Sequence, residues 1–341
     1  MDYKDCLQQI QKYLENSPLI ILGSGASVDY GFPLMHELSI EIKKHSDKFD
    51  TTEFENLCKN LDIMHLEEAI DKTTLSDDSS NILRGIVWRC INERDIAFYK
   101  KLSQEKSDFA LADLLKILIQ SAPNTTNVIT TNYDRLTEYA ADLIGATTVT
   151  GFEGTLIRKM DFPKSSLQQR RIRSRERVVN IWKVHGSLDW FLKDNGDIVS
   201  FPLSTDILPN YSPLIIAPGK GKYNHTHKEP YRDVIAQADL AFSRAESFLC
   251  IGYGFNDDHI QPKLIEQIKN GKPIIVLCLE ATESCRQNVM TNDVKKYMII
   301  EFSSTGKTLV TSNNYKKDYD GNFWKLPDFI QTIWGVKNGY L

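Results

Sequence analysis

Residues 18–33, PLIILGSGASVDYGFP, decide the fold that we expect for this chain. An apolar run ends at Gly23-Ser24-Gly25, and a helical pattern follows it. Glycine lets a backbone approach a phosphate closely and adopt positive φ angles, and the start of a helix presents unpaired N–H groups to an anion. Val28 stands at the third position of a G-x-G-x-x-G pattern, so a plain tight turn between a strand and a helix is the alternative.

Six further apolar runs alternate with helical patterns along the chain. They are rich in Ile, Val and Leu at successive positions, which is typical of strands buried on both faces of a parallel sheet. The runs are residues 126–132, 181–187, 213–219, 247–254, 273–280 and 297–302, and the helical patterns are residues 107–121, 133–145, 230–244 and 257–270. This alternation predicts a doubly wound α/β fold with a parallel sheet.

Two stretches interrupt the alternation. Residues 41–121 lack convincing strands and carry Leu and Ile at helical spacings, which predicts a helical subdomain inserted after the first strand and helix. Residues 151–180 are an irregular basic insertion with an arginine-rich run, QQRRIRSRER (168–177). That run is either a solvated loop or frayed helix, or a basic patch for a partner or for nucleic acid.

The composition is that of an ordinary globular protein. Of 341 residues, 25% are charged and 41% hydrophobic, and the net charge of −4 provides no overall basic surface for nucleic acid. No apolar run approaches the roughly 18 residues that a membrane helix needs, and the polar N-terminus lacks a signal peptide. The six cysteines are scattered without a C-x-x-C pair, which argues against disulfides and a cysteine zinc site. We therefore expect a cytoplasmic protein that spans no membrane.

Polar side chains follow two of the predicted strands. In TTNYD (130–134), Asn132 and Asp134 are two residues apart, so an extended backbone points both to one side at the end of the sheet where ligands bind. In KVHGS (183–187), His185 follows an apolar strand and could act as a general base near neutral pH. The alternatives are that Asn132 or Asp134 caps the next helix, and that His185 is a hydrogen-bonded structural residue.

A second glycine turn lies in SFLCIGYGFNDDHI (247–260). Gly252 and Gly254 would again bring the backbone close to a ligand, whereas Asn256 and Asp257 are suitable as N-caps of the following helix. Glu280 ends the next strand, where a carboxylate could bind ribose hydroxyls or simply be solvated.

The order of these motifs resembles the sirtuin-like family, the silent information regulator type. GSGAS…GFP, TTNYD, VHGS, GYGFND and VLCLE are similar to the family's G-A-G-x-S…G-I-P, T-Q-N-x-D, H-G, G-T-S and a late strand with Asn or an acid. The similarity spans residues 18 to about 281. TTNYD together with GYGF resembles the bacterial branch found in antiphage defence proteins more than the protein deacylases.

The resemblance implies that the whole chain, residues 1–341, is a sirtuin-like catalytic domain with a Rossmann-like NAD site. Asn132 would contact the nicotinamide ribose and position the attacking group, Asp134 would contact the carboxamide, and His185 would be the general base. NAD would be bound by residues of the two glycine turns and of the late strand. These cofactor-binding residues are Gly23, Gly25, Ala26 and Ser27 for the pyrophosphate, Phe32 for the nicotinamide end, Gly252, Gly254 and Asn256 for phosphates and the adenosine ribose, and Glu280 for that ribose.

The chain departs from the deacylases of this family at one place. Deacylase sirtuins carry a four-cysteine zinc module between the H-G and G-T-S motifs, and no cysteine occurs here from 91 to 249. We therefore expect no zinc and predict an NAD⁺ glycohydrolase that releases nicotinamide and ADP-ribose, with NAD as substrate. The alternatives are an NAD-dependent protein deacylase or ADP-ribosyltransferase, or a nucleotide sensor without turnover.

An enzyme that depletes NAD must be kept silent in a healthy cell. We therefore expect control by assembly, as a homo-oligomer or by a partner in trans. In the bacterial systems that the chain resembles, a HerA-type ATPase ring is such a partner. Nucleic acid as a partner is left open by the arginine-rich run.

Overall fold

The computed structural model describes residues 2–45, 48–104, 108–120, 125–162, 177–217, 228–313 and 315–336. Seven parallel strands form most of a nine-stranded sheet, in the order β12-β11-β10-β1-β2-β6-β3. Their bounds are β1 (Leu19–Leu22), β2 (Thr125–Thr130), β3 (Thr147–Val149), β6 (Val178–Lys183), β10 (Phe248–Ile251), β11 (Ile274–Cys278) and β12 (Tyr297–Ser304). Two antiparallel strands, β13 (Lys307–Ser312) and β14 (Tyr315–Asp320), extend the sheet beyond β12.

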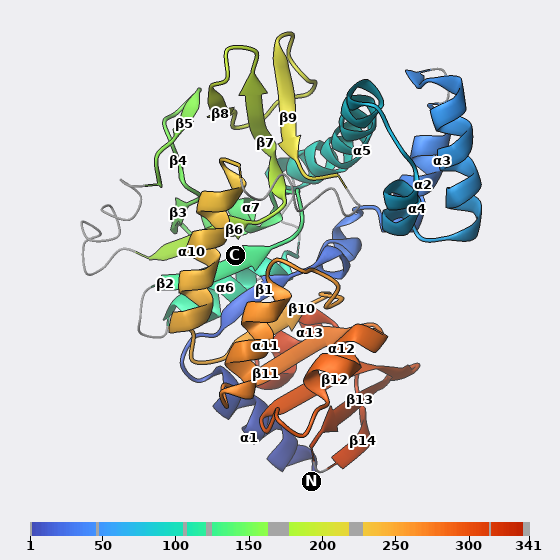
Figure 1. Cartoon of the computed structure of the whole chain (residues 1–341). Helices are drawn as coiled ribbons and strands as arrows, with labels where there is room; N and C mark the ends of the chain where they lie inside the picture. The colour runs from blue at the N-terminus through green and yellow to red at the C-terminus, as the bar shows by residue number, and fades with distance from the viewer. Residues whose placement is uncertain are drawn as a thin grey trace.

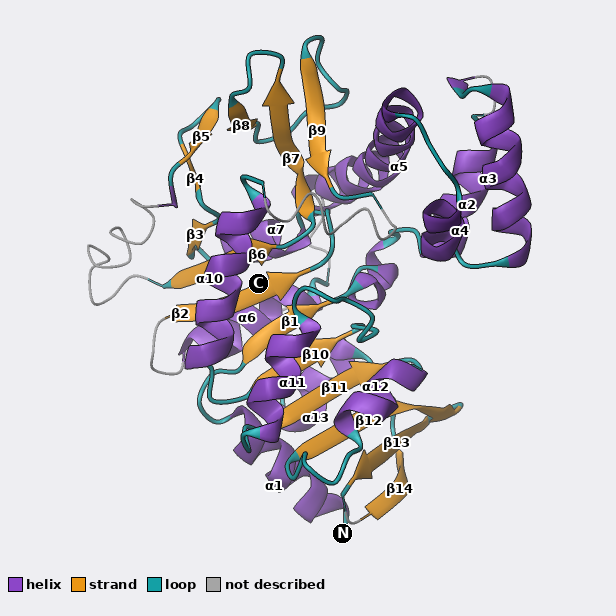
Figure 2. Ribbon diagram, viewed as in Figure 1, coloured by secondary structure: helices purple, strands orange, loops and turns teal. Residues whose placement is uncertain are grey.

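Helices cover both faces of this sheet, as the apolar strands predict (Figure 2). Ile20 and Leu22 of β1 belong to a core shared with α1 (Tyr3–Leu14), α6 (Ala110–Gln120), α7 (Leu136–Leu143) and α13 (Leu326–Trp334). Leu19 and Ile21 belong to a second core shared with α10 (Tyr231–Arg244), α11 (Gln261–Lys269) and α12 (Glu283–Val289). Successive side chains of a strand point to opposite faces, so β1 is buried on both faces. The prediction of a doubly wound α/β fold is confirmed.

The strand order turns back between β1 and β10. From β1 the chain proceeds through β2 to β6 on one side, and later from β10 through β11 to β12 on the other. Such a reversal leaves a crevice at the carboxyl ends of the two central strands, where ligands bind in open α/β sheets.

A small antiparallel sheet lies beyond the end of the main sheet that holds β6 and β3 (Figure 1). It contains β4 (Phe152–Glu153), β5 (Arg158–Met160), β8 (Ile198–Ser200), β7 (Gly186–Lys193) and β9 (Tyr211–Ile215), in that order. The apolar run 213–219 was expected in the parallel sheet, and that expectation is wrong, because β9 pairs antiparallel with β7. Buried apolar strands have the same composition in either sheet, so composition could not show to which sheet residues 213–219 belong.

Four helices fill most of the stretch between β1 and α6: α2 (Met35–Lys43), α3 (Thr51–Ile63), α4 (Leu66–Lys72) and α5 (Asp77–Gln104). Figure 1 shows α2, α3 and α4 beside the main body, with α5 running back to the small sheet. α6 lies against the main sheet and α7. The boundaries 41–121 and 151–180 stay predictions, and the arginine-rich run lies outside the described residues except for Arg177.

β1 is followed by two short 3-10 turns, Ser24–Ala26 and Val28–Tyr30, and not directly by the α-helix that the sequence pattern predicted. The helix-dipole argument for anion binding at this turn therefore loses its support.

Over the described residues, no helix combines the length and the apolar character needed to cross a membrane.

The turn between β6 and β7 provides a test of the fold. Gly186 has a φ of +88°, and a Cβ there would lie 2.0 Å from the Leu214 carbonyl oxygen, whereas Gly145, at φ +66°, has open space. We expect Gly145→Ala to cost about 1–2 kcal/mol from the left-handed backbone alone, and Gly186→Ala to cost more because β9 must also move. Thermal unfolding of both variants measures this, and equal melting temperatures would contradict the packing described.

Candidate functional site

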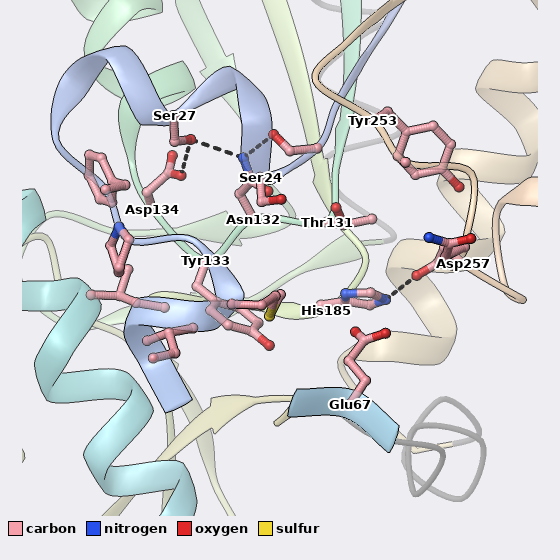
Figure 3. Close-up of a pocket in the computed structure, with 18 residues that line it drawn as sticks. Ser24, Ser27, Glu67, Thr131, Asn132, Tyr133, Asp134, His185, Tyr253 and Asp257 are labelled. Carbon is pink, nitrogen blue, oxygen red and sulfur yellow. Dashed lines mark hydrogen bonds and ion pairs between the residues drawn. The ribbon is translucent and has the colours of Figure 1, made fainter. Parts of the chain in front are cut away.

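A cavity of about 220 Å³ opens at the carboxyl ends of the parallel strands, beside the reversal of strand order. It is bounded by both glycine turns, the TTNYD loop, His185, and residues of α2, α4 and α5 (Figure 3). The lining residues are Gly23, Ser24, Ser27, Phe32, Pro33, Met35, Leu38, Glu67, Ile91, Thr131, Asn132, Tyr133, Asp134, His185, Tyr253, Gly254, Asn256 and Asp257.

The two glycine turns contact each other through their backbones. Gly23 N donates to Ile251 O at 3.1 Å, and Gly25 N donates to Gly252 O at 3.1 Å. A Cβ on Gly23 would lie 2.4 Å from Gly252 O, and one on Gly252 would lie 2.3 Å from Ala26 N. These glycines are therefore required for the approach of one loop to the other, and the amide of Gly25 is already engaged.

The TTNYD loop is hydrogen-bonded to the first glycine turn. Asn132 Nδ2 donates to Gly23 O at 2.9 Å and to Ser27 Oγ at 3.0 Å. Ser27 Oγ in turn donates to Asp134 Oδ2 at 2.7 Å, and Asp134 Oδ1 accepts from Leu136 N at the start of α7. Asp134 therefore bonds to the backbone at the start of α7, which is the capping role given above as the alternative. It also fixes the orientation of Ser27 (Figure 3).

The carboxyl group of Asp134 is shielded from solvent. Burial raises its pKa above the ordinary value, while Lys183 and the Ser27 hydroxyl act in the opposite direction. Lys183 is itself buried beneath the loop, where its Nζ donates to the backbone carbonyl of Asp134 and to Glu138 Oε1. A buried charge is costly unless it is paired, so this lysine ties the loop to β6 and α7.

His185 lies between the end of β6 and the start of β7. Its Nε2 is 2.6 Å from Asp257 Oδ2, and both side chains are about 94% buried. Asp257 Oδ1 accepts from the backbone N–H groups of His259 and Ile260, so the same carboxylate also caps the turn after the second glycine motif. The sequence suggested Asp257 only as a cap. Its pairing with His185 joins loops 72 positions apart and carried no signal in the sequence.

The helix α5 is anchored to the same loop. Asp95 Oδ1 accepts from Arg135 N at 2.8 Å, and Asp95 Oδ2 accepts from Arg135 Nη2 at 2.6 Å. Trp88 Nε1 donates to Leu188 O at 2.8 Å in β7. Both members of the Arg135–Asp95 pair are buried, so the helical stretch is joined firmly to the loop that carries Asn132.

The structure brings together most of the residues expected at the site. All three expected catalytic residues line the cavity, as do Gly23, Ser27, Phe32, Gly254 and Asn256. Gly25, Ala26 and Gly252 lie outside the lining, in the contact between the glycine turns. Glu280 is exposed and is not part of the lining either.

Part of the chain matches a known family model. Residues 126–287, just under half of the chain, match the family model described as SIR2-like domain. This stretch is similar to a SIR2-like domain. No curated protein matches the sequence.

Solved Sir2 structures are similar over most of the chain at low identity. A Sir2 homolog–NAD complex is 15% identical, with 88% of each chain covered and a TM-score of 0.47. A structure on sirtuin substrate affinity is 14% identical, with 87% of this chain and 93% of that chain covered and a TM-score of 0.46. A Sir2 protein bound to a propionylated peptide is 13% identical, with 85% and 91% covered and a TM-score of 0.42.

Among the residues that the structure describes, no group of three or more His, Cys, Asp or Glu side chains could hold a metal ion. The expectation that the protein contains no zinc stays a prediction.

The buried carboxyl of Asp134 predicts a pH-dependent difference in stability. Because its folded-state pKa is raised, its contribution to stability is fully present below the unfolded pKa, about 3.9, and is lost as the pH rises through the folded pKa. Asp134→Asn has no carboxyl group to ionise at this position, so it does not show this loss of stability. The melting temperature of the variant minus that of the wild type should therefore increase upward from about pH 4, and a constant difference would contradict the raised pKa.

Proposed function

We propose that this protein is an NAD⁺ glycohydrolase that releases nicotinamide and ADP-ribose. The observation that carries the proposal is that Asn132 and His185, which follow different strands, line one cavity at the carboxyl edge of a doubly wound sheet. The match of residues 126–287 to the SIR2-like domain supports NAD as the substrate.

The volume and lining of the cavity suit one end of a dinucleotide. Its volume of about 220 Å³ is below the roughly 300–1,000 Å³ of sites that enclose a whole drug-sized ligand. Phe32, Pro33 and Met35 form an apolar wall suited to the nicotinamide ring, while Asn132 and His185 supply polar groups for the ribose. The remainder of the dinucleotide would extend over the glycine turns, beside Gly254 and Asn256.

The chemistry is cleavage of the bond between the ribose and nicotinamide. This bond breaks through an oxocarbenium-like transition state, as in other glycoside hydrolyses. Nicotinamide is cationic in NAD⁺ and leaves as a neutral molecule, so no general acid is required. The protein must therefore orient the substrate, activate water and exclude other nucleophiles.

His185 would accept a proton from water or a ribose hydroxyl, and Asn132 would fix the ribose. In a neutral imidazole one nitrogen donates and the other accepts. Nε2 lies 2.6 Å from Asp257 Oδ2, and we propose that in the reacting enzyme Nε2 carries the hydrogen and Nδ1 accepts the proton. Asp257 is thus a positioning residue that also stabilises the imidazolium, as a carboxylate does in catalytic triads.

The biological role that we propose is depletion of NAD in bacterial antiphage defence, in the cytoplasm. The resemblance of TTNYD and GYGF to that branch supports this role. Control would come from assembly as a homo-oligomer or from a HerA-type ATPase. Size-exclusion chromatography with light scattering tests this point, and a strict monomer with constitutive activity would contradict it.

Removal of either central side chain should abolish most of the activity. We expect Asn132→Ala and His185→Ala each to lower nicotinamide release by about 100–10,000-fold, the range for a positioned acid–base group. Purified protein with NAD⁺, followed by chromatography of nicotinamide and ADP-ribose, provides the measurement. Release should need no acylated peptide, which distinguishes hydrolysis from deacylation. Full activity in both variants would end the assignment.

The Asp257–His185 pair is tested by a substitution that keeps the helix cap. In Asp257→Asn the side-chain oxygen can still accept from His259 N and Ile260 N, but the negative charge beside His185 is lost. We expect kcat to fall by about 100-fold or more, with little change in melting temperature. Asp258→Asn, on the adjacent exposed residue, is the matched control and should retain activity. If both variants behave alike, Asp257 has no role beyond capping.

A further inference from the structure

One charged residue of the cavity comes from outside the strand ends. Glu67 belongs to the first turn of α4, within the helical stretch between β1 and α6, and it lines the cavity together with Asn132 and His185. Figure 3 shows its carboxylate pointing toward the His185 ring, on the side away from Ser24 and Ser27. No motif in the sequence pointed to this residue.

The packing of α4 explains why this acid faces the cavity. Leu66 and Ala69 are buried and hold the helix in place, while Glu67 is half-buried between them and the cavity. Acidic residues in a first turn favour the helix dipole, and Glu67 and Glu68 both satisfy that preference. Glu68, however, is exposed and pairs with Lys72 at 2.7 Å on the outer surface. The dipole favours an acid at either position, and Glu67 is the one of the two that lines the cavity.

We propose that Glu67 is a second catalytic carboxylate, which holds the attacking water against His185. This inference rests on the proposed NAD⁺ hydrolysis. An ionised carboxylate only accepts hydrogen bonds, so it can take one hydrogen of the water while His185 takes the other. The oxygen lone pair then points at the ribose carbon, and orientation of this kind is a large part of enzymatic rate enhancement.

The step balances without any further reactant. A water oxygen forms a bond to the anomeric carbon of the ribose as the bond from that carbon to the nicotinamide nitrogen breaks. The electron pair of the broken bond stays on nicotinamide, which leaves neutral. One water proton moves to His185, and the second hydrogen stays on the product hydroxyl, hydrogen-bonded to Glu67.

This arrangement predicts discrimination between water and methanol as the acceptor. Methanol has one hydroxyl hydrogen for His185, and its methyl group would face Glu67. A partly buried carboxylate that meets a methyl group loses a hydrogen-bond partner, which is unfavourable. The wild type should therefore disfavour methanol. In Glu67→Gln this discrimination should be weaker, because a hydrogen bond to a neutral amide oxygen is roughly half as strong as one to a carboxylate, so less is lost when a methyl group faces it.

The test uses Glu67→Gln and Glu67→Asp, with Glu68→Gln as the matched surface control. Each protein is incubated with NAD⁺ in water and in water with methanol, and nicotinamide, ADP-ribose and methyl ADP-ribose are quantified. We expect Glu67→Gln to lower kcat by about 100-fold with a small change in KM. We also expect it to raise the ratio of methyl ADP-ribose to ADP-ribose above that of the wild type. Glu67→Asp should keep the low ratio, and Glu68→Gln should match the wild type in both measures.

The outcomes separate the two proposals. An active wild type with an unchanged Glu67→Gln overturns the role of Glu67 alone. A slower Glu67→Gln with the wild-type product ratio also overturns it, because a merely structural defect slows both acceptors equally. A wild type that releases no nicotinamide, with or without a partner ATPase, overturns the glycohydrolase proposal and the role of Glu67 with it.

Discussion

The backbone contact between the two glycine turns is the constraint on which the site depends. At the reversal of strand order, the loops after β1 and β10 approach until the amides of Gly23 and Gly25 donate to carbonyls of the opposite loop. Any side chain at Gly23 or Gly252 would collide with backbone atoms. Backbone atoms cannot move aside as a flexible side chain can, so the wall of the cavity on this side is rigid. Asn132 is fixed to this wall by its hydrogen bond to the Gly23 carbonyl oxygen.

Buried polar groups then fix the remaining parts relative to this wall. Lys183 connects β6 to the TTNYD loop from below, and the Arg135–Asp95 pair connects that loop to α5. Breaking one partner of a buried pair is strongly destabilising because the other charge is left uncompensated. The position of the loop that carries Asn132 is therefore fixed by contacts with the first glycine turn, with β6 and with α5. The helical stretch is thus a structural part of the site.

The main sheet could be predicted because its signal is local. Runs such as 247–254 and 273–280 combine β-branched residues with flanking glycine, and strands of a parallel sheet buried on both faces need that composition. The small sheet could not be predicted, since β7 alternates little and β9 has the composition of a core strand. Their pairing depends on the turn at Gly186, where the positive φ and the close approach of Leu214 become visible only in three dimensions.

The local pattern of residues is enough to place particular residue types at the carboxyl ends of the strands. Asn132 and His185 could be predicted at these ends because a short stretch of sequence shows where an apolar strand stops and which side chains share a face. Folding in three dimensions brings Asp257 to face His185 and brings Glu67 of α4 to the same cavity, and it leaves Glu280 in solvent away from the cavity. The physical reason is that hydrogen bonds and charge pairs act over a few ångströms, whereas these residues are separated by tens of positions along the chain and meet only after the sheet and its insertions have packed.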